Sequence, residues 1–109
     1  MFYRLRKNNG EMDRHSAGKW VLPDGSTHSL SYNDVKVQPL RYWTSDSGRR
    51  YPVSWVMHIP GIQQHFRIEA LINDQEMATG IYYWEGAVKV LDESSEKLLG
   101  FGYLEMAGY

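Results

Sequence analysis

The feature that most constrains this chain is a series of short strand-like runs, separated at regular spacing by clusters of turn-forming residues. The turn signals are Asn8-Asn9-Gly10, Pro23-Asp24-Gly25, Ser45-Asp46-Ser47-Gly48, Pro60-Gly61 and Asp92-Glu93-Ser94-Ser95-Glu96. Such clusters favour tight turns and therefore mark the ends of strands. No amphipathic run reaches the roughly ten residues of a typical helix. The pattern predicts an all-β fold of about eight antiparallel strands, arranged as a barrel or a sandwich.

The clearest predicted hairpin joins Tyr51–Ile59 to Gln64–Leu71. Because side chains alternate between the faces of a strand, a turn centred between Gly61 and Ile62 defines two faces. The apolar face carries Val53, Trp55, Met57, Phe66, Ile68 and Ala70. The opposite face carries Ser54, Val56, His58, His65, Arg67 and Glu69. We expect the apolar face to be buried and the histidines, Arg67 and Glu69 to be exposed.

A second predicted hairpin pairs Tyr83–Val90 with Leu98–Met106. One of its faces is apolar and interrupted by glycines, whereas the other carries Tyr83, Glu85, Tyr103 and Glu105. With a turn centred near Ser94, Tyr83 would face Glu105 and Glu85 would face Tyr103. Two carboxylates and two phenols would then share one face of the hairpin.

The remaining predicted elements are strands at Phe2–Lys7, Gly18–Leu22, Thr27–Leu30 and Val35–Thr44, and a single helical turn at Tyr32–Asp34 capped by Ser31. Pro39 lacks the amide hydrogen that a central strand requires, so its strand should lie at an edge or contain a bulge. The opening strand Phe2–Lys7 should lie at an open seam, and unpaired edges recruit partners. The chain also has 42% hydrophobic residues, enough to leave an apolar patch on its surface. The open edge and the apolar surface together predict a homodimer or docking to a partner domain.

Composition excludes several functional classes. The net charge is -1 and Lys and Arg form no long run, so we expect no nucleic-acid binding. The absence of cysteine excludes disulfides, thiolate catalysis and cysteine zinc sites. The apolar runs are far shorter than the roughly 20 residues of a membrane span, and the start lacks the apolar core of a signal peptide. As written, the chain is expected to be soluble and cytoplasmic, to need no cofactor and to bind no metal.

Several ordered motifs carry a resemblance to a known family. They are Trp20-Val21-Leu22-Pro23-Asp24-Gly25, Trp43-Thr44-Ser45, Ser47-Gly48, Tyr51-Pro52, Asp74-Gln75-Glu76, Tyr83-Trp84-Glu85-Gly86-Ala87-Val88, Gly102-Tyr103-Leu104-Glu105 and Gly108-Tyr109. Their order and spacing resemble the carotenoid 1,2-hydratase (hydroxyneurosporene synthase) and AttH family over nearly the whole chain. The resemblance implies an antiparallel, lipocalin-like (calycin) β-barrel of about eight strands. It also implies two such domains in full-length members, of which residues 1–109 correspond to the second as a single domain.

The resemblance also bears on activity. The resemblance implies that the hydratases use an aspartate and aromatic residues for catalysis. These residues lie in the earlier part of those proteins and include an Asp-His dipeptide. No Asp-His dipeptide occurs in this chain. The hydratase activity therefore has weaker support than the fold, and exported relatives leave the compartment open.

The candidate catalytic residues are Glu85, Glu105 and Tyr103. A carboxyl group in a cavity could protonate an alkene, the step that hydration of a polyene requires. The alternative is that this face points outward and its polar groups are solvated, because carboxylates are seldom buried without partners.

The candidate ligand-binding residues are Trp43, Trp55, Glu76, Tyr83 and Trp84. An eight-stranded barrel can enclose one small apolar molecule, and these side chains would then line its wall. The alternatives are that the tryptophans form a solid core and that Asp74-Gln75-Glu76 is a turn whose side chains cap the backbone.

His58 and His65 face each other across the first hairpin and could bind a divalent metal. A stable site needs a third or fourth ligand, and none is in register on these two strands. Solvated surface histidines are therefore the favoured interpretation.

Two functional hypotheses follow. The first is a non-enzymatic module that binds a small apolar molecule, such as an isoprenoid, or docks onto a missing partner domain. The second is a hydratase or isomerase of terpenoid or carotenoid alkenes that uses carboxylic acid protonation. The missing Asp-His dipeptide favours the first hypothesis.

Overall fold

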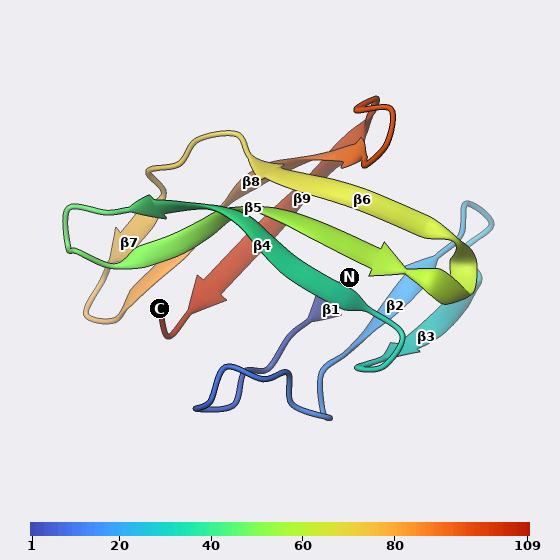
Figure 1. The fold of residues 1–109 in the computed structure, drawn as a ribbon, viewed down its shortest axis with the longest axis horizontal. Coiled ribbons are helices and arrows are strands. Elements are labelled where there is room, and N and C mark those ends of the chain that lie inside the picture. The colour runs from blue at the N-terminus through green and yellow to red at the C-terminus, as the bar shows by residue number, and fades with distance from the viewer. The chain divides into compact units, whose positions relative to one another are not determined.

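Nine β-strands and one short 3-10 helix form the secondary structure of the computed structural model, which describes residues 1–109 (Figure 1). The strands are β1 (Phe2–Tyr3), β2 (Ala17–Val21), β3 (Thr27–Ser31), β4 (Lys36–Thr44), β5 (Arg50–Ile59), β6 (Gln64–Ala70), β7 (Glu76–Ala78), β8 (Tyr82–Asp92) and β9 (Leu98–Ala107), and the helix is η1 (Pro60–Ile62). The strand pairs β1–β2, β2–β3, β6–β8, β7–β8 and β8–β9 are antiparallel, as the sequence predicts. No helix has the length and apolar character needed to cross a membrane.

The chain divides into two compact units, which are described separately. The first comprises Met1–Lys36 and Ile59–Gln64, and the second comprises Val37–His58 and His65–Tyr109. Strands β1, β2 and β3 form a three-stranded sheet in the first unit. The second sheet has the order β4-β5-β6-β8-β7, with β9 paired to β8. Pro39 lies in β4 at the edge of this sheet, as predicted from its missing amide hydrogen.

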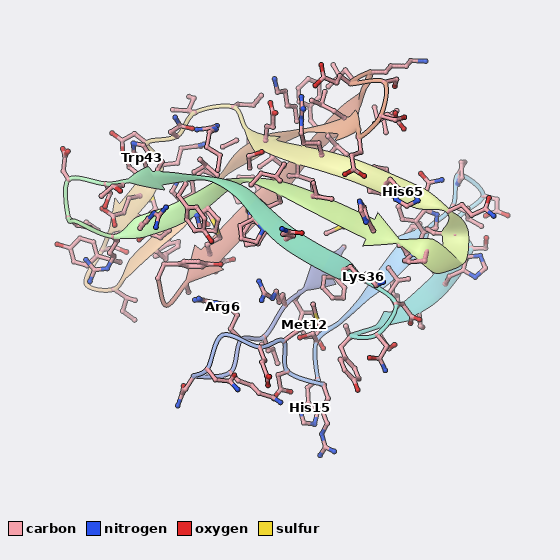
Figure 2. The ribbon with its side chains drawn as sticks, viewed as in Figure 1. Arg6, Met12, His15, Lys36, Trp43 and His65 are labelled. Carbon is pink, nitrogen blue, oxygen red and sulfur yellow. The ribbon has the colours of Figure 1, made fainter.

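The first strand is much shorter than predicted. Regular pairing ends at Tyr3, and only an isolated bridge between Arg6 and Met12 continues it (Figure 2). The amide of Leu5 donates to Ser16 Oγ at 2.9 Å, so a side chain takes the place of a neighbouring strand. The predicted turn at Asn8-Asn9-Gly10 is present, with Gly10 at φ 85°.

Strands β2 and β3 pair as predicted around the turn at Pro23-Asp24-Gly25, from Ala17 opposite Ser31 to Val21 opposite Thr27. The predicted helical turn at Tyr32–Asp34 is instead a hydrogen-bonded turn. Ser31 donates to Asp34 Oδ2 through both its amide and its hydroxyl, at 2.7 Å each. Such local side-chain bonds stabilise a turn without continuing into a helix.

The core of the second unit lies on one face of the six-stranded sheet. Its buried members are Tyr51, Val53, Trp55, Trp84 and Met106. Partly buried residues packed against them are Val37, Trp43, Ile68, Ala70, Leu104 and Tyr109. Each indole N–H in the buried set donates to a backbone carbonyl: Trp55 to Pro52 at 3.0 Å and Trp84 to Asn73 at 2.7 Å. Burying these rings therefore leaves no indole donor without a partner.

The apolar face predicted for the first hairpin agrees with the structure, but the opposite face is more buried than predicted, with Ser54 only 4% exposed. Val53, Trp55 and Phe66 are buried, while Met57, Ile68 and Ala70 are partly buried. On the other face His65 is exposed, but His58, Arg67 and Glu69 are only partly exposed. Their polar partners explain the difference, because Arg67 and Glu69 pair at 2.9 Å and His58 contacts Glu93.

The register predicted for the β8–β9 hairpin is wrong by two residues. Glu85 lies opposite Glu105, Tyr83 opposite Ala107, and Tyr103 opposite Ala87. A shift of two residues preserves the faces, because side chains alternate with a period of two. Trp84 and Met106 therefore still share the apolar face.

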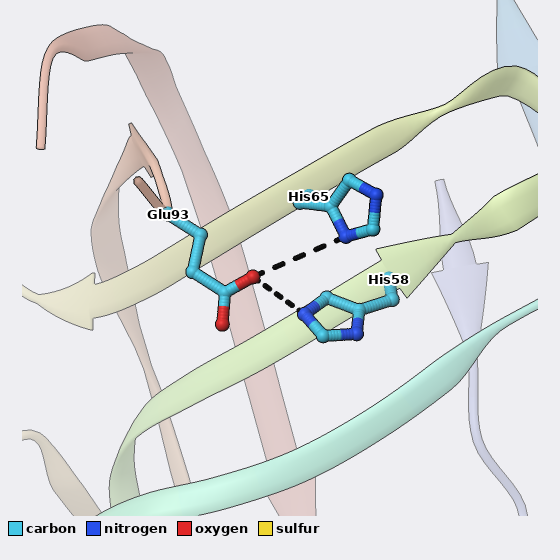
Figure 3. A group of neighbouring side chains, drawn as sticks. All are labelled: His58, His65 and Glu93. Atoms are coloured by element: carbon cyan, nitrogen blue, oxygen red, sulfur yellow. Dashed lines mark hydrogen bonds and ion pairs between the residues drawn. The ribbon is translucent and has the colours of Figure 1, made fainter. Parts of the chain in front are cut away.

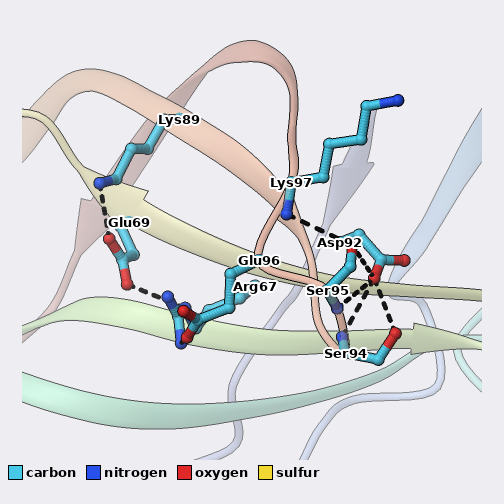
Figure 4. Close-up of polar contacts among 8 residues, drawn as sticks. All are labelled: Arg67, Glu69, Lys89, Asp92, Ser94, Ser95, Glu96 and Lys97. Carbon is cyan, nitrogen blue, oxygen red and sulfur yellow. Dashed lines mark hydrogen bonds and ion pairs between the residues drawn. The ribbon is translucent and has the colours of Figure 1, made fainter.

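The turn chemistry explains the shift. The Asp92 carboxylate accepts hydrogen bonds from the amides and hydroxyls of Ser94 and Ser95, at 2.7–3.1 Å (Figure 4). Glu96 then adopts a left-handed conformation at φ 59°, and the pairing slips by one position between Val90 and Leu91. The centre of the turn thus lies one residue beyond Ser94.

Candidate functional site

Glu85 and Glu105 occupy directly opposed positions on β8 and β9, on the face away from the core. Glu85 is partly buried, Glu105 is exposed, and Tyr103 is 68% exposed. Partial desolvation and then the Glu85 charge raise the pKa of Tyr103 above its ordinary value of 10.0. The arrangement brings two carboxylates and a phenol together on an open surface, where they can exchange protons with any molecule that covers this face. The catalytic role of these three residues remains a prediction.

The five residues predicted to bind a ligand do not share one face. Trp55 and Trp84 are in the core, and Trp43 stacks on Tyr51 with ring centroids 6.4 Å apart. Tyr83 lies on the opposite face of β8 from Trp84, because the two are consecutive in the strand. Tyr83 therefore cannot line the same wall as the tryptophans, and the ligand-binding role of the set remains a prediction.

Glu76 closes a polar network beside this core. Its Oε1 accepts hydrogen bonds from Ser47 Oγ at 2.7 Å and Tyr51 Oη at 2.8 Å. Burial raises the pKa of Glu76, but the hydroxyl donors and the Arg49 charge outweigh it and bring the pKa below its usual value. Burial and the adjacent Glu76 raise the pKa of Tyr51 to about 12. The network joins the turn after β4 to β7, which fits a structural role for Glu76.

Gln75 also has a backbone-capping role, as the second interpretation of Asp74-Gln75-Glu76 predicts. Its side-chain amide donates to Ile72 O at 2.8 Å. The same amide lies directly over Gly86, where an added Cβ would overlap it. The glycine therefore makes room for the capping side chain.

Sequence reasoning missed Glu93, which joins the two histidines of the first hairpin. Its Oε2 lies 2.6 Å from His58 Nε2 and 4.0 Å from His65 Nδ1 (Figure 3). Glu93 is thus a possible third ligand from outside the two strands that the sequence analysis considered. Glu93 immediately follows β8, in a turn that local patterns assign only to chain reversal, so its position beside β5 and β6 depends on the sheet order.

A chain of ion pairs crosses the same face of β6 and β8. Lys89 contacts Glu69 at 3.0 Å, Glu69 contacts Arg67 at 2.9 Å, and Arg67 contacts Glu96 at 2.7 Å (Figure 4). The Glu96 hydrogen bond is the largest influence on Arg67 and raises its pKa. Each charged side chain here has a partner of opposite sign, so a role in stabilising the association of the strands accounts for these ion pairs.

The comparisons with known proteins agree on the fold. A solved protein from Nitrosomonas europaea described as an AttH is 26% identical, with a TM-score of 0.84 over 97% of this chain. Kievitone hydratase from Nectria haematococca is 18% identical, with a TM-score of 0.71 over 97% of this chain, a likeness that shows the fold alone. In each case the match covers 33% of the solved chain, so this chain spans about a third of their length. The search of curated proteins found no match.

The predicted lipocalin-like, antiparallel all-β fold is thus confirmed by a solved relative as well as by the strand pairing. The AttH-like family model matches residues 1–109, and the chain therefore belongs to the AttH-like family.

Proposed function

We propose that this chain is a lipocalin-like docking module, and that the outer face of the β8–β9 hairpin holds a separate domain of the AttH type. The observation that carries the proposal is a row of exposed apolar side chains along β9. On the outer face, Phe101 is 69% exposed, Tyr103 is 68% exposed and Leu99 is half exposed. A sheet with one solvated face normally places polar residues there, and contiguous apolar patches mark interaction sites.

The position of the row supports docking. β9 pairs with β8 and lies at the edge of the sheet, so both its outer side chains and its outer backbone edge are accessible to a partner. Glu85, Glu105 and Lys89 lie on the same face beside Tyr103 and Phe101. A central apolar row with charged residues around it has the composition of a protein interface with a polar rim.

The length of the solved relatives indicates the kind of partner. Both are about three times as long as the region that this chain matches. The remaining two thirds of such a protein provide a natural occupant for an exposed apolar face. A specific interface of this kind buries about 1,000 Å² or more in total.

Co-purification tests the proposal. The chain is co-expressed with the part of the Nitrosomonas europaea AttH protein that lies outside the matched third, and the size of the product is measured by light scattering. We expect a one-to-one complex that Phe101→Ser weakens at least tenfold, because a buried aromatic anchor contributes more than about 1.4 kcal/mol.

Val21→Ser provides the matched control, because Val21 is also an exposed apolar strand residue but lies on β2. It should leave the complex unchanged. If a second copy of the chain binds in place of the partner, the product would be a homodimer that Phe101→Ser weakens. That result would still assign docking to this face, but the occupant would be a second copy of the chain and not the proposed domain. A monomer that binds no partner, or association unaffected by Phe101→Ser, would refute the docking function.

A pocket for a small apolar ligand such as an isoprenoid is the other form of this hypothesis. Trp55 and Trp84 report on the core, so a ligand that enters it should quench tryptophan fluorescence saturably. Trp55→Phe or Trp84→Phe should reduce that response. A response that rises linearly with a polyene or a fatty acid, without saturation, would argue against a pocket.

The second candidate function is alkene hydration, which the direct opposition of Glu85 and Glu105 beside Tyr103 favours. A carboxylic acid would donate its proton to one alkene carbon, water would add to the other, and the surplus proton of that water would return to the carboxylate. Turnover of an acyclic carotene by the chain with its partner, abolished by Glu85→Gln and by Glu105→Gln, would support this candidate. Unchanged turnover in both variants would exclude these residues as the proton donor.

A further inference from the structure

His58, His65 and Glu93 form a cluster that the proposed function does not use. The three come from β5, from β6 and from the residue that follows β8, and their ligand atoms all lie within 4.8 Å of one another. Two imidazoles and one carboxylate are a donor set that binds zinc with an open fourth position. Figure 3 shows both rings directed towards the same carboxylate oxygen.

An ordinary ion pair accounts for only part of this geometry. His58 Nε2 makes a short contact of 2.6 Å with Glu93 Oε2, which is a complete hydrogen bond by itself. His65 Nδ1 nevertheless converges on the same oxygen at 4.0 Å, with its ring edge-on to His58 at a centroid separation of 4.6 Å. Two ring nitrogens and one carboxylate oxygen that converge in this way can share a cation.

The backbone holds the three residues in place. The amide of Glu93 donates to the carbonyl of His65 at 3.2 Å, and β5 and β6 are neighbours in the sheet. The turn that contains Glu93 is fixed by the Asp92 side chain, which accepts from Ser94 and Ser95. Sites carried on strands and fixed turns keep their ligands closer to the required geometry than sites on long loops.

The separations suit a metal of zinc size. Bonds of about 2.0–2.1 Å in a tetrahedron place two ligand atoms about 3.3 Å apart. The two histidine–carboxylate separations of 2.6 and 4.0 Å fall on either side of this value, and no ligand atoms of the cluster are more than 4.8 Å apart, so side-chain rotations that draw the two rings together would admit the ion. The side chains are 33%, 51% and 36% exposed for His58, His65 and Glu93, which leaves solvent access for a water ligand.

We propose that His58 Nε2, His65 Nδ1 and Glu93 Oε2 bind one divalent transition-metal ion of the zinc type, with water in the fourth position. The ion would link the β5–β6 hairpin to the β8–β9 turn through three bonds. It would also present an exchangeable position to an oxygen or nitrogen ligand.

Calorimetric titration of the complete, untagged chain with zinc chloride tests the site. We expect binding of one ion per chain, with no comparable response to magnesium or calcium, because imidazole suits zinc and oxygen ligands suit the other two. Cobalt(II) should give the intense visible absorption of a four-coordinate ion. His58→Ala, His65→Ala and Glu93→Gln should each weaken zinc binding at least tenfold, since even residues that only support a ligand have effects of about 10–100-fold.

His15→Ala is the matched control. His15 Nδ1 contacts Asp13 Oδ1 at 2.7 Å, a similar histidine–carboxylate pair that has no second histidine. Its loss should leave zinc affinity unchanged. Circular dichroism without metal establishes whether each variant is folded. If an alanine variant is unfolded, Glu93→Gln, which keeps the size of the side chain, is used in its place. Binding that survives all three ligand substitutions, binding lost in His15→Ala, or no binding at one ion per chain would overturn the proposal.

Discussion

At Gly18 the absence of a side chain decides how closely β1 can approach β2. A Cβ atom at this position would overlap the carbonyl oxygen of Met1 and would lie 2.8 Å from the Cα atom of Phe2. The close approach is fixed by the amide of Lys19, which donates to the same Met1 oxygen at 2.8 Å. Gly18 thus serves strand packing.

Gly18→Ala should destabilise the protein by about 1–3 kcal/mol, the usual cost of overpacking when the neighbouring atoms belong to the backbone. Urea denaturation measures the change. Gly61→Ala is the control in the same unit, because a Cβ at Gly61 meets no atom within 4 Å. Equal effects of the two substitutions would show that Met1 and Phe2 do not pack against Gly18 in solution.

Asp92 shows how one carboxylate can couple a turn to pH. Hydrogen bonds from the Ser95 amide and hydroxyl, followed by those from Ser94, lower its pKa from 3.8 to about 2. The folded state therefore holds the proton less tightly than the unfolded state. The resulting stabilisation is present above pH 3.8 and is lost as the pH falls towards about 2.

Asp92→Asn should be less stable than the parent chain at neutral pH, and the difference should shrink between pH 3.8 and about 2. The amide oxygen of asparagine can still accept hydrogen bonds, so the variant isolates the contribution of the charge. Urea unfolding at a series of pH values measures it. A difference that stays constant down to pH 2 would assign the effect to something other than ionisation of Asp92.

At the scale of single elements, the β8–β9 hairpin separates what alternation predicts from what it cannot. Alternation assigns the two faces correctly, because it needs only the extended backbone of each strand. Register also requires the position of the turn and of any irregularity. Here the left-handed Glu96 and the slip between Val90 and Leu91 set it.

The observed register predicts an electrostatic response. Glu85 and Glu105 are directly opposite, so Glu85→Lys should replace repulsion with attraction and stabilise the hairpin by about 0.2–1 kcal/mol. Thermal unfolding of Glu85→Lys, of Glu105→Lys and of the variant with both substitutions measures the coupling between the two positions. The double variant should lose the gain, because like charges face each other again.

Glu85→Gln distinguishes relief of repulsion from new attraction and should give a smaller gain. Additive effects in the double variant would contradict the pairing of Glu85 with Glu105. In the register that the sequence predicted, with Glu85 facing Tyr103, Glu85 and Glu105 are only diagonal neighbours and the coupling should be weaker.

Across the molecule, β8 has the most extensive pairing. It pairs with β6 and β7 along one edge and with β9 along the other, and Trp84, near its start, is completely buried. β1, in contrast, contains two residues and pairs with β2 alone. Local stability should therefore differ widely between the two strands.

Hydrogen exchange measures this difference directly. We expect the amides of β8 to exchange slowest among the strands, and those of Phe2 and Tyr3 to exchange among the fastest. Mass spectrometry of peptic fragments gives sufficient resolution. Protection of β1 equal to that of β8 would mean that the opening strand has a stronger partner in solution than β2.

The sequence by itself determined the all-β class, most of the turns and the buried face of the two predicted hairpins. Gly10, Pro60 and Gly61 act through local backbone preferences, and the alternation around Val53 and Trp55 needs no knowledge of neighbouring strands. Only the tertiary structure decided the pairing of Glu85 with Glu105 and the arrival of Glu93 beside His58 and His65. These depend on sheet order and on a side-chain-stabilised turn, since residues 35 positions apart meet only when strands distant in the chain become neighbours.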